Sequence, residues 1–250
     1  MATSEIDLDA SWEVAGKLHG GYLLATMTRC ALDDTHPHPL AASTHFLSSP
    51  EPGAAVVEVE RLRTGRTIAT SRIRLLQDGR ARVEVLLTSG RLDPDSEPRW
   101  SGGRPPELPP VEDCPRAPAE STLGIRVGIL DHIEARMDIS TTQWALGLPG
   151  AGAGVVRGWM RRADGVDTTP TDLLVFTDAL PPVTFDLGIF GWVPTLELTV
   201  LIRALPAAGW VQVVQRAQLL QGGWLDEECE IWDSAGRLVA QARQLAAYRE

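Results

Sequence analysis

Residues 16–34 read GKLHGGYLLATMTRCALDD, and their apolar positions recur at the spacing of a helix. The apolar face that this spacing produces consists of Leu23, Leu24, Met27, Cys30 and Ala31. Because such a stripe is typical of a helix that packs on one side against other elements, it predicts a helix over about residues 20–33. Gly20 and Gly21 stand at the beginning of this helix.

The pattern changes from helical spacing to alternation after this helix. Segments rich in β-branched residues, separated by glycine-containing turns, follow at 41–50, 54–63, 66–79 and 80–90. Residues 77–80, Gln-Asp-Gly-Arg, have the composition of a tight hairpin turn. A further strand is predicted ahead of the helix, near residues 5–14. We therefore expect the first half of the chain to be one helix and an antiparallel meander.

The second half repeats this order of elements. Thr169 is placed as an N-cap, Pro170 as the first helical residue and Asp172 three residues after the cap, so a second helix is predicted to begin here. Pro181 and Pro182 are expected to end it. Strands are predicted near 133–146, 154–162, 195–204, 210–220, 227–233 and 237–248. One helix followed by four strands, twice, indicates an α+β fold in which one continuous sheet surrounds two central helices.

Between the two halves, residues 91–122 are dense in proline, glycine, serine and acidic residues. Proline lacks the N–H that helices and sheets require, so this stretch is predicted to be a linker and not part of either. We therefore divide the chain into an N-terminal unit, 1–98, a Pro/Gly-rich linker, 99–122, and a C-terminal unit, 123–250.

The overall composition restricts the class of protein. The chain has 250 residues, a net charge of −10 and 44% hydrophobic residues, which is enough for a well-packed core. An acidic chain is a poor binder of nucleic acid, because that affinity depends on basic patches. The apolar runs are too short for a membrane-spanning helix, and the first residues lack the features of a signal peptide. Three widely spaced cysteines in such a chain are typical of free thiols. We expect a cytoplasmic protein that binds neither nucleic acid nor membrane.

Several chemistries have no matching motif. The sequence contains neither the GxSxG of serine hydrolases nor the GxxxxGK[ST] of phosphate-binding loops. The glycines of residues 150–154 are out of register for a dinucleotide-binding loop. His36 and His38 lie among prolines without the cysteine, histidine or carboxylate neighbours of a zinc site. No metal and no cofactor are therefore expected.

Polar residues interrupt two otherwise apolar segments. Asp178 is predicted in the last turn of the second helix, where the helix dipole disfavours a carboxylate, so it is either a surface residue or a base with a raised pKa. Gln244 lies on a strand face otherwise composed of small apolar residues and needs a hydrogen-bond partner if that face is inward. On the strand near 195–204, alternation places Thr195, Glu197 and Thr199 on one face.

Five segments together resemble the bacterial acyl-CoA thioesterase II family, in an actinobacterial-type branch. They are HGGYLLATM (19–27), VERLRTGRTIATSRIRLLQDGRARVEVLLTSG (59–90), FTDALPP (176–182), WVPTLELTV (192–200) and GRLVAQARQ (236–244). The resemblance implies a double hotdog, two tandem units that each wrap an antiparallel sheet around a central helix, in agreement with the repeat. It also implies an acyl-CoA substrate, and the open sheet edges of such units favour a homo-oligomer.

The family hydrolyses acyl-CoA with an Asp, a Thr and a Gln that hold a water molecule. By motif position these are Asp178 as general base, Thr195 and Gln244. The sequence departs from the family pattern at Thr195-Leu196-Glu197-Leu198, so Thr199 is the alternative hydroxyl. Backbone N–H groups at Gly20 and Gly21 are candidates for stabilising the oxyanion, and His19 is a candidate ligand contact.

Two other functions stay open on the sequence. One is a different hotdog enzyme, an acyl thioester hydratase or dehydratase, which usually employs a histidine paired with Asp or Glu; no histidine lies near Asp178 or Gln244 in sequence. The other is a non-catalytic acyl-CoA-binding protein whose site has been lost.

Overall fold

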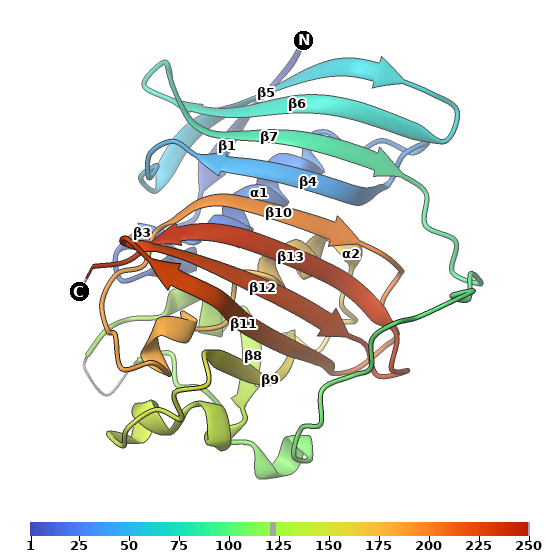
Figure 1. Cartoon of the computed structure of the whole chain (residues 1–250). Coiled ribbons are helices and arrows are strands. Elements are labelled where there is room, and N and C mark those ends of the chain that lie inside the picture. The colour runs from blue at the N-terminus through green and yellow to red at the C-terminus, as the bar shows by residue number, and fades with distance from the viewer. Residues whose placement is uncertain (121–123, 250) are drawn as a thin grey trace.

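The computed structural model describes residues 1–120 and 124–249. An antiparallel sheet curves around two helices, α1 (Gly20–Arg29) and α2 (Pro170–Phe176) (Figure 1). The first half of the chain contributes β1 (Ala2–Leu8), β4 (His38–Phe46), β5 (Gly53–Thr64), β6 (Ile68–Gln77) and β7 (Arg80–Gly90). The second half contributes β8 (Ile133–Met137), β9 (Val155–Arg162), β10 (Thr195–Ile202), β11 (Val211–Gln221), β12 (Trp224–Trp232) and β13 (Leu238–Ala247). A separate two-stranded sheet pairs β2 (Glu13–Val14) with β3 (Lys17–Leu18).

The two halves join edge to edge into one sheet. Its strand order is β1-β5-β6-β7-β4-β10-β13-β12-β11-β9-β8, so β4 and β10 form the seam between the halves. There the strands run antiparallel, with Leu198 opposite Thr44. The predicted α+β architecture of two helix-and-sheet units is confirmed. The division at 98, 99, 122 and 123 stays a prediction, and its boundary at 122 and 123 lies outside the described residues.

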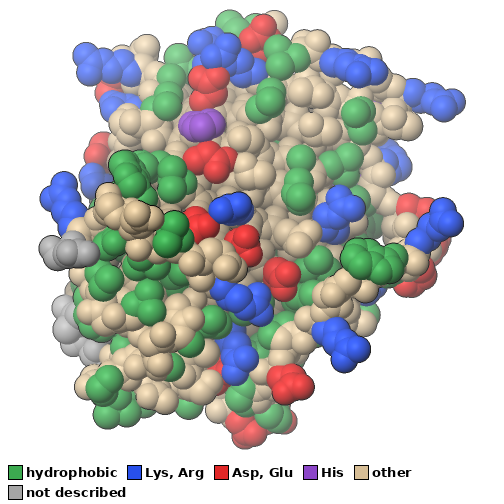
Figure 2. All heavy atoms as spheres, viewed as in Figure 1, with side chains coloured by type: hydrophobic (Ala, Val, Ile, Leu, Met, Phe, Trp, Pro, Cys, Tyr) green, Lys and Arg blue, Asp and Glu red, His purple; other side chains and the backbone are tan. Residues whose placement is uncertain are grey.

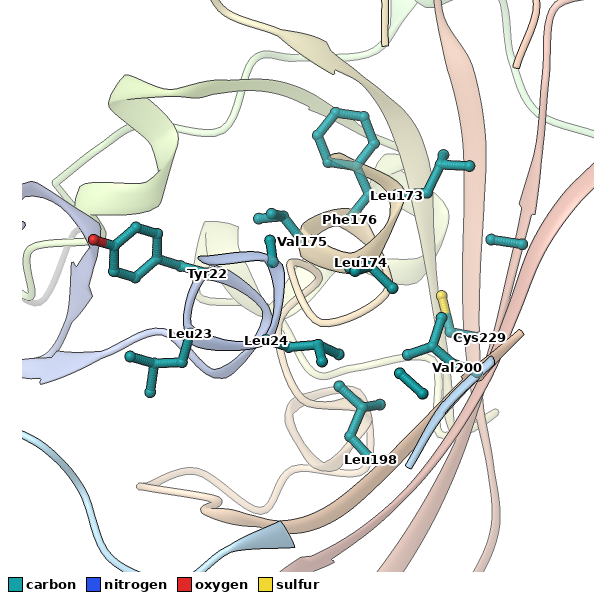
Figure 3. Packing of buried hydrophobic residues seen from close by; sticks show 14 of the residues in the cluster. Tyr22, Leu23, Leu24, Leu173, Leu174, Val175, Phe176, Leu198, Val200 and Cys229 are labelled. Carbon is teal, nitrogen blue, oxygen red and sulfur yellow. The ribbon is translucent and has the colours of Figure 1, made fainter. Parts of the chain in front are cut away.

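The core fills the space between the helices and the concave face of the sheet. Leu24 of α1 and Leu174 of α2 are completely buried, and both point toward the strands (Figure 3). Leu198, Val200 and Cys229 point back at them from β10 and β12. The two helices also pack against each other, so the end of one lies beside the beginning of the other.

Both helices are shorter than predicted, because the chain tightens at their ends. After α1, the N–H of Ala31 bonds to the carbonyl of Thr28 in an i→i−3 turn. The carboxylate of Asp33 then accepts hydrogen bonds from the N–H groups of Thr35 and His36. After α2, the N–H of Asp178 bonds to the carbonyl of Val175, a tighter i→i−3 turn. Asp178 therefore follows the helix. The prediction that it lies in the last turn of the helix is wrong.

Two predicted strands end early because an aspartate caps the next turn. Asp9 accepts a hydrogen bond from the N–H of Ser11 at 2.8 Å and ends β1. Asp138 accepts one from the N–H of Ser140 at 2.9 Å, so the stretch predicted as a strand over 133–146 becomes β8 followed by 3-10 turns. In both places a short polar side chain competes successfully for backbone donors.

The outer face of the sheet carries interspersed acidic and basic side chains (Figure 2). Ion pairs cross between neighbouring strands, as between Arg243 and Asp226 at 2.9 Å and between Arg74 and Glu58 at 2.7 Å. Within the described residues, neither helix has the length and apolar character needed to cross a membrane. The three cysteines are free thiols, as predicted.

Candidate active site

Asp178 lies beside the N-terminus of α1, although α1 and Asp178 come from opposite halves of the chain. Its Oδ2 accepts a hydrogen bond from the N–H of Gly21 at 2.7 Å. The partial positive charge of a helix N-terminus stabilises a carboxylate placed in this way. The side chain of Asp178 is only 11% exposed. The structure thus brings together three candidate residues from separate halves of the chain, Asp178, Gly20 and Gly21.

Glycine at these two helix positions allows the close approach. A Cβ on Gly20 would lie 2.8 Å from Oδ2 of Asp178 and 2.9 Å from Cζ of Phe46. A Cβ on Gly21 would lie 2.9 Å from the carbonyl oxygen of Leu174 in α2. Gly20 therefore leaves room for the carboxylate, whereas Gly21 leaves room for the neighbouring helix.

His19 is the N-cap of α1 and is buried against Asp178. Its Nδ1 accepts a hydrogen bond from the N–H of Tyr22 at 3.2 Å, so the proton of a neutral ring resides on Nε2. Nε2 donates to the backbone carbonyl of Asp178 at 2.8 Å and lies 3.4 Å from its Oδ2. A histidine is thus adjacent to Asp178 in space, which its distance along the sequence had not suggested. Both ring nitrogens are engaged in holding the helix ends together.

The surroundings of Asp178 change its acidity. Burial raises the pKa of the Asp178 carboxyl above its ordinary value, while the nearby His19 ring and the N–H of Gly21 partly counteract this rise. A carboxylate that binds protons more readily than usual is suited to act as a general base.

Thr195 and Gln244 form a second cluster on the concave face of the sheet. The hydroxyl of Thr195 donates to Oε1 of Gln244 at 3.0 Å. A β-bulge causes this contact: Thr195 is opposite Ala246, but Glu197 is already opposite Leu245. The extra residue turns Thr195 inward, so the prediction that it shares a face with Glu197 and Thr199 is wrong.

Thr199, the alternative hydroxyl of the sequence analysis, lies away from this cluster. Its hydroxyl donates to Glu197 at 2.6 Å, and Glu197 is opposite the exposed His45 on β4. This pair belongs to the outer face of the sheet. Thr195 and not Thr199 is the hydroxyl that reaches Gln244.

Glu227 extends the cluster and was not singled out from the sequence. It lies on β12 directly opposite Gln244 and is 2% exposed. Nε2 of Gln244 donates to its Oε2, and the N–H of Val183 donates to its Oε1 at 2.8 Å. A signal was available: alternation along β12 puts this carboxyl on the same face as Leu225 and Cys229, both buried.

Electrostatics connects the two clusters. Burial raises the pKa of Glu227, and the negative charge of Asp178 adds to this rise. Burial raises the pKa of the Cys229 thiol, and the negative charges of Glu227, Glu230 and Asp178 add to this rise. Charges interact more strongly in the protein interior than in water, so Asp178 and Glu227 influence each other although no hydrogen bond joins them. Across the described chain, no group of three or more His, Cys, Asp or Glu is arranged to hold a metal ion.

Comparisons with known proteins match both halves of the chain. A family profile described as the acyl-CoA thioesterase N-terminal domain matches residues 8–90. A second profile, described as the acyl-CoA thioesterase C-terminal domain, matches residues 111–248. The matches therefore cover both helix-and-sheet units.

Individual proteins agree with these matches. An uncharacterized protein of Mycobacterium tuberculosis is 31% identical over 267 residues, covering 97% of this chain and 89% of that protein. A crystal structure from Thermobifida fusca, provisionally described as a thioesterase II, is 31% identical with a TM-score of 0.89, covering 99% of this chain and 92% of the other. A hotdog protein of unknown function from Alicyclobacillus acidocaldarius, 20% identical, has a TM-score of 0.82 and covers 99% of this chain and 93% of its own, which confirms the double hotdog fold. The chain belongs to the acyl-CoA thioesterase family.

Proposed function

We propose that this protein hydrolyses fatty acyl-CoA to a free fatty acid and CoA, using a water molecule held by Asp178, Thr195 and Gln244. One observation carries the proposal: a buried carboxylate with a raised pKa, bonded to a glycine-lined helix N-terminus, interacts electrostatically with Glu227, the hydrogen-bond partner of the Thr195–Gln244 pair. General bases with a raised pKa and fixed polar partners are typical of sites that activate water.

The reaction proceeds without a covalent intermediate on the enzyme. Asp178 removes a proton from the water molecule while the oxygen of that water attacks the thioester carbonyl carbon. The carbonyl oxygen becomes an oxyanion, and the tetrahedral species then collapses with cleavage of the C–S bond. The protonated Asp178 returns its proton to the departing thiolate, which leaves both products neutralised and the base regenerated.

The helix N-terminus of α1 supplies the oxyanion donor in this proposal. The N–H of Gly21 is already bonded to Asp178. The N–H of Gly20 has no acceptor within the described part of the chain, and the helix dipole adds favourable potential at this position. Gly20 is therefore the donor that we assign to the oxyanion, and His19 acts by fixing the loop that carries Asp178.

The contact between His19 and Asp178 also raises the alternative of a hydratase or dehydratase. Such an enzyme needs a ring nitrogen that is free to exchange a proton with the substrate. Both nitrogens of His19 are occupied, Nδ1 by the N–H of Tyr22 and Nε2 by the carbonyl of Asp178. This occupancy favours hydrolysis. A change in enoyl-thioester absorbance without thiol release would support the alternative.

The test is thiol release from acyl-CoAs of short, medium and long chain, comparing wild type with Asp178→Asn. We expect kcat to fall about 10²–10⁴-fold in the variant, because the amide cannot accept the proton. The wild-type rate should also fall as pH decreases through the raised pKa of Asp178, since only the ionised form is a base. Asp167→Asn, at an exposed aspartate ahead of α2, is the matched control.

The outcomes separate the functions that stay open. Thiol release that Asp178→Asn leaves unchanged would retain the thioesterase and remove Asp178 as its base. Acyl-CoA binding without release at any chain length would favour a non-catalytic acyl-CoA-binding protein.

The setting of this activity belongs to the same proposal. Fatty acyl-CoA as substrate places the protein in fatty acid metabolism, and its site needs no metal or cofactor. We expect it in the cytoplasm. We also expect a homo-oligomer, because β1 is an edge strand that pairs with β5 alone among the described strands, whereas the other edge, β8, is bridged by residues 115–117. Light scattering of the purified chain measures the oligomer directly, and a monomeric mass would refute it.

A further inference from the structure

Glu227 is a buried carboxyl group that the proposed reaction does not use. Its Oε1 accepts a hydrogen bond from the N–H of Val183 at 2.8 Å, and its Oε2 accepts one from Nε2 of Gln244. Burying a charged group is costly unless hydrogen bonds compensate for the lost water. Glu227 bonds to Gln244 of the proposed site and is almost completely buried. The burial of its charge therefore needs an explanation.

The reason lies in the direction of the hydrogen bonds. The amide of Gln244 can rotate by half a turn and exchange its oxygen and nitrogen with almost no change in shape. An ionised carboxylate only accepts hydrogen bonds, so Glu227 holds the nitrogen of the amide toward β12. The oxygen of Gln244 then faces Thr195, whose hydroxyl must donate to it, as observed at 3.0 Å.

This direction determines what Thr195 offers to the reacting water. With its proton committed to Gln244, the Thr195 oxygen presents only lone pairs and accepts one proton of the water. Asp178 accepts the other proton, and a lone pair of the water is left for the carbonyl carbon. If the amide were reversed, the hydroxyl of Thr195 would be free to donate to the water and would occupy the lone pair that attacks.

We propose that Glu227 is a positioning residue that fixes the amide orientation of Gln244, and through it the direction of the Thr195 hydroxyl, for attack by water. This inference rests on the proposed thioesterase function. Glu227 does not contact the reacting atoms in this scheme. It acts through two intervening side chains, as outer hydrogen-bond partners commonly do in other sites.

The proposal implies that two carboxyl groups must be ionised together. The titratable groups that interact electrostatically with Glu227 are Asp178, after α2, and Cys229, on the same strand. Gln244 and Gln215 contribute neutral hydrogen-bonding side chains from β13 and β11. Burial raises the pKa values of both Asp178 and Glu227. A protonated Glu227 becomes a donor and no longer selects one amide orientation.

The experiment compares wild type, Glu227→Gln and Glu228→Gln in thiol release over a range of pH. Glu228 is the next residue on β12 and belongs to the opposite, partly exposed face, so its variant is the matched control. We expect Glu227→Gln to lower kcat about 10–100-fold with little change in KM. At low pH, a plot of log kcat against pH should rise with a slope approaching two in wild type. The slope should be one in Glu227→Gln, because one of the two ionisations has been removed.

Each outcome decides the question. Hydrolysis by wild type with a slope of one, or by Glu227→Gln with an unchanged kcat, overturns the role of Glu227 and leaves the thioesterase intact. Absence of thiol release by wild type refutes the proposed function, and this inference with it. Should Glu227→Gln not fold, the slope of the wild-type acid limb remains a sufficient test. In a Gln244→Leu background, Glu227→Gln should change kcat less than twofold, since no amide remains to be positioned.

Discussion

The two ends of the helix pair have the same geometry but different chemistry. Asp178 is the second residue after α2, and Ala31 is the second residue after α1, with an equivalent backbone hydrogen bond to the residue three positions before it. At one end, Asp178 supplies the acceptor for the N-terminus of α1. At the other, Thr169 and Asp172 satisfy the N-terminus of α2 from within, through a capping box.

The strands beside these ends differ in the same way. Gln244 and Leu87 lie equally far beyond the turn glycines of their hairpins, and opposite them are Glu227 and Ser71. Leu87 is completely buried, and the hydroxyl of Ser71 has no hydrogen-bond partner among the residues described. One scaffold thus carries a polar, charge-bearing site at one end and an apolar packing site at the other. In α1, the His19 cap accepts from the N–H of Tyr22 and leaves the N–H of Gly21 to the distant Asp178.

The largest effect is expected when the polar end is mutated to resemble the apolar end. The double variant Glu227→Ser/Gln244→Leu is expected to lower kcat by about 10²–10³-fold, since it removes the fixed amide that orients Thr195. The protein should remain folded, because exchanging a buried charged network for neutral groups is often tolerated. Thiol release and thermal unfolding measure the two effects. A kcat near that of wild type would show that the difference between the ends is not the basis of activity.

The reverse change affects stability. Leu87→Gln places an amide where Ser71 is the polar neighbour on the facing strand, so we expect a loss of about 2–3 kcal/mol in the free energy of unfolding. The kcat of the folded enzyme should not change. Leu86→Gln, at a side chain that is 51% exposed, is the control and should change stability by less than about 0.5 kcal/mol. Equal effects of the two variants in urea unfolding would contradict the apolar character of this end.

The smallest expected effect concerns the internal cap of α2. Thr169→Ala removes the hydroxyl that accepts from the N–H of Asp172 at 3.3 Å and should destabilise the protein by about 1 kcal/mol. Thr171→Ala, inside the helix, leaves the cap in place and serves for comparison. Activity should be unaffected in both. A tenfold loss of kcat in Thr169→Ala would mean that both ends take part in the reaction.

Local signals in the sequence were sufficient for much of this fold. The cap at Thr169 and the turn before Arg80 depend on neighbouring residues, and both are observed as predicted. Alternation placed Gln244 on a face of small apolar residues that could point inward or outward, and the structure shows it inward, with Thr195 and Glu227 as partners. Asp178 was a candidate from its place at the end of the second helix, whereas the roles of Asp178 and Thr195 came from the family resemblance and stay predictions.

Contacts between distant segments explain what was missed. The inward turn of Thr195 depends on a bulge whose register is set by Ala246 on the partner strand. His19 and Asp178 are 159 residues apart in the sequence. They come into contact only because the two helices pack against each other. Alternation along β12 indicates that Glu227 is buried, but its partners Gln244 and Val183 lie 17 and 44 residues away in the sequence. None of these contacts has a signature within a window of neighbouring residues.

The seam between β4 and β10 has a consequence for symmetry. Two identical subunits joined edge to edge would repeat every substitution, so both sites would gain or lose function together. Here the halves belong to one polypeptide, and a residue can change in one half without changing in the other. The covalent connection thus permits a division of labour, with Ala31 and Leu87 in one half contributing to packing and Asp178 and Gln244 in the other contributing polar groups. A substrate analogue should accordingly saturate at one molecule per chain.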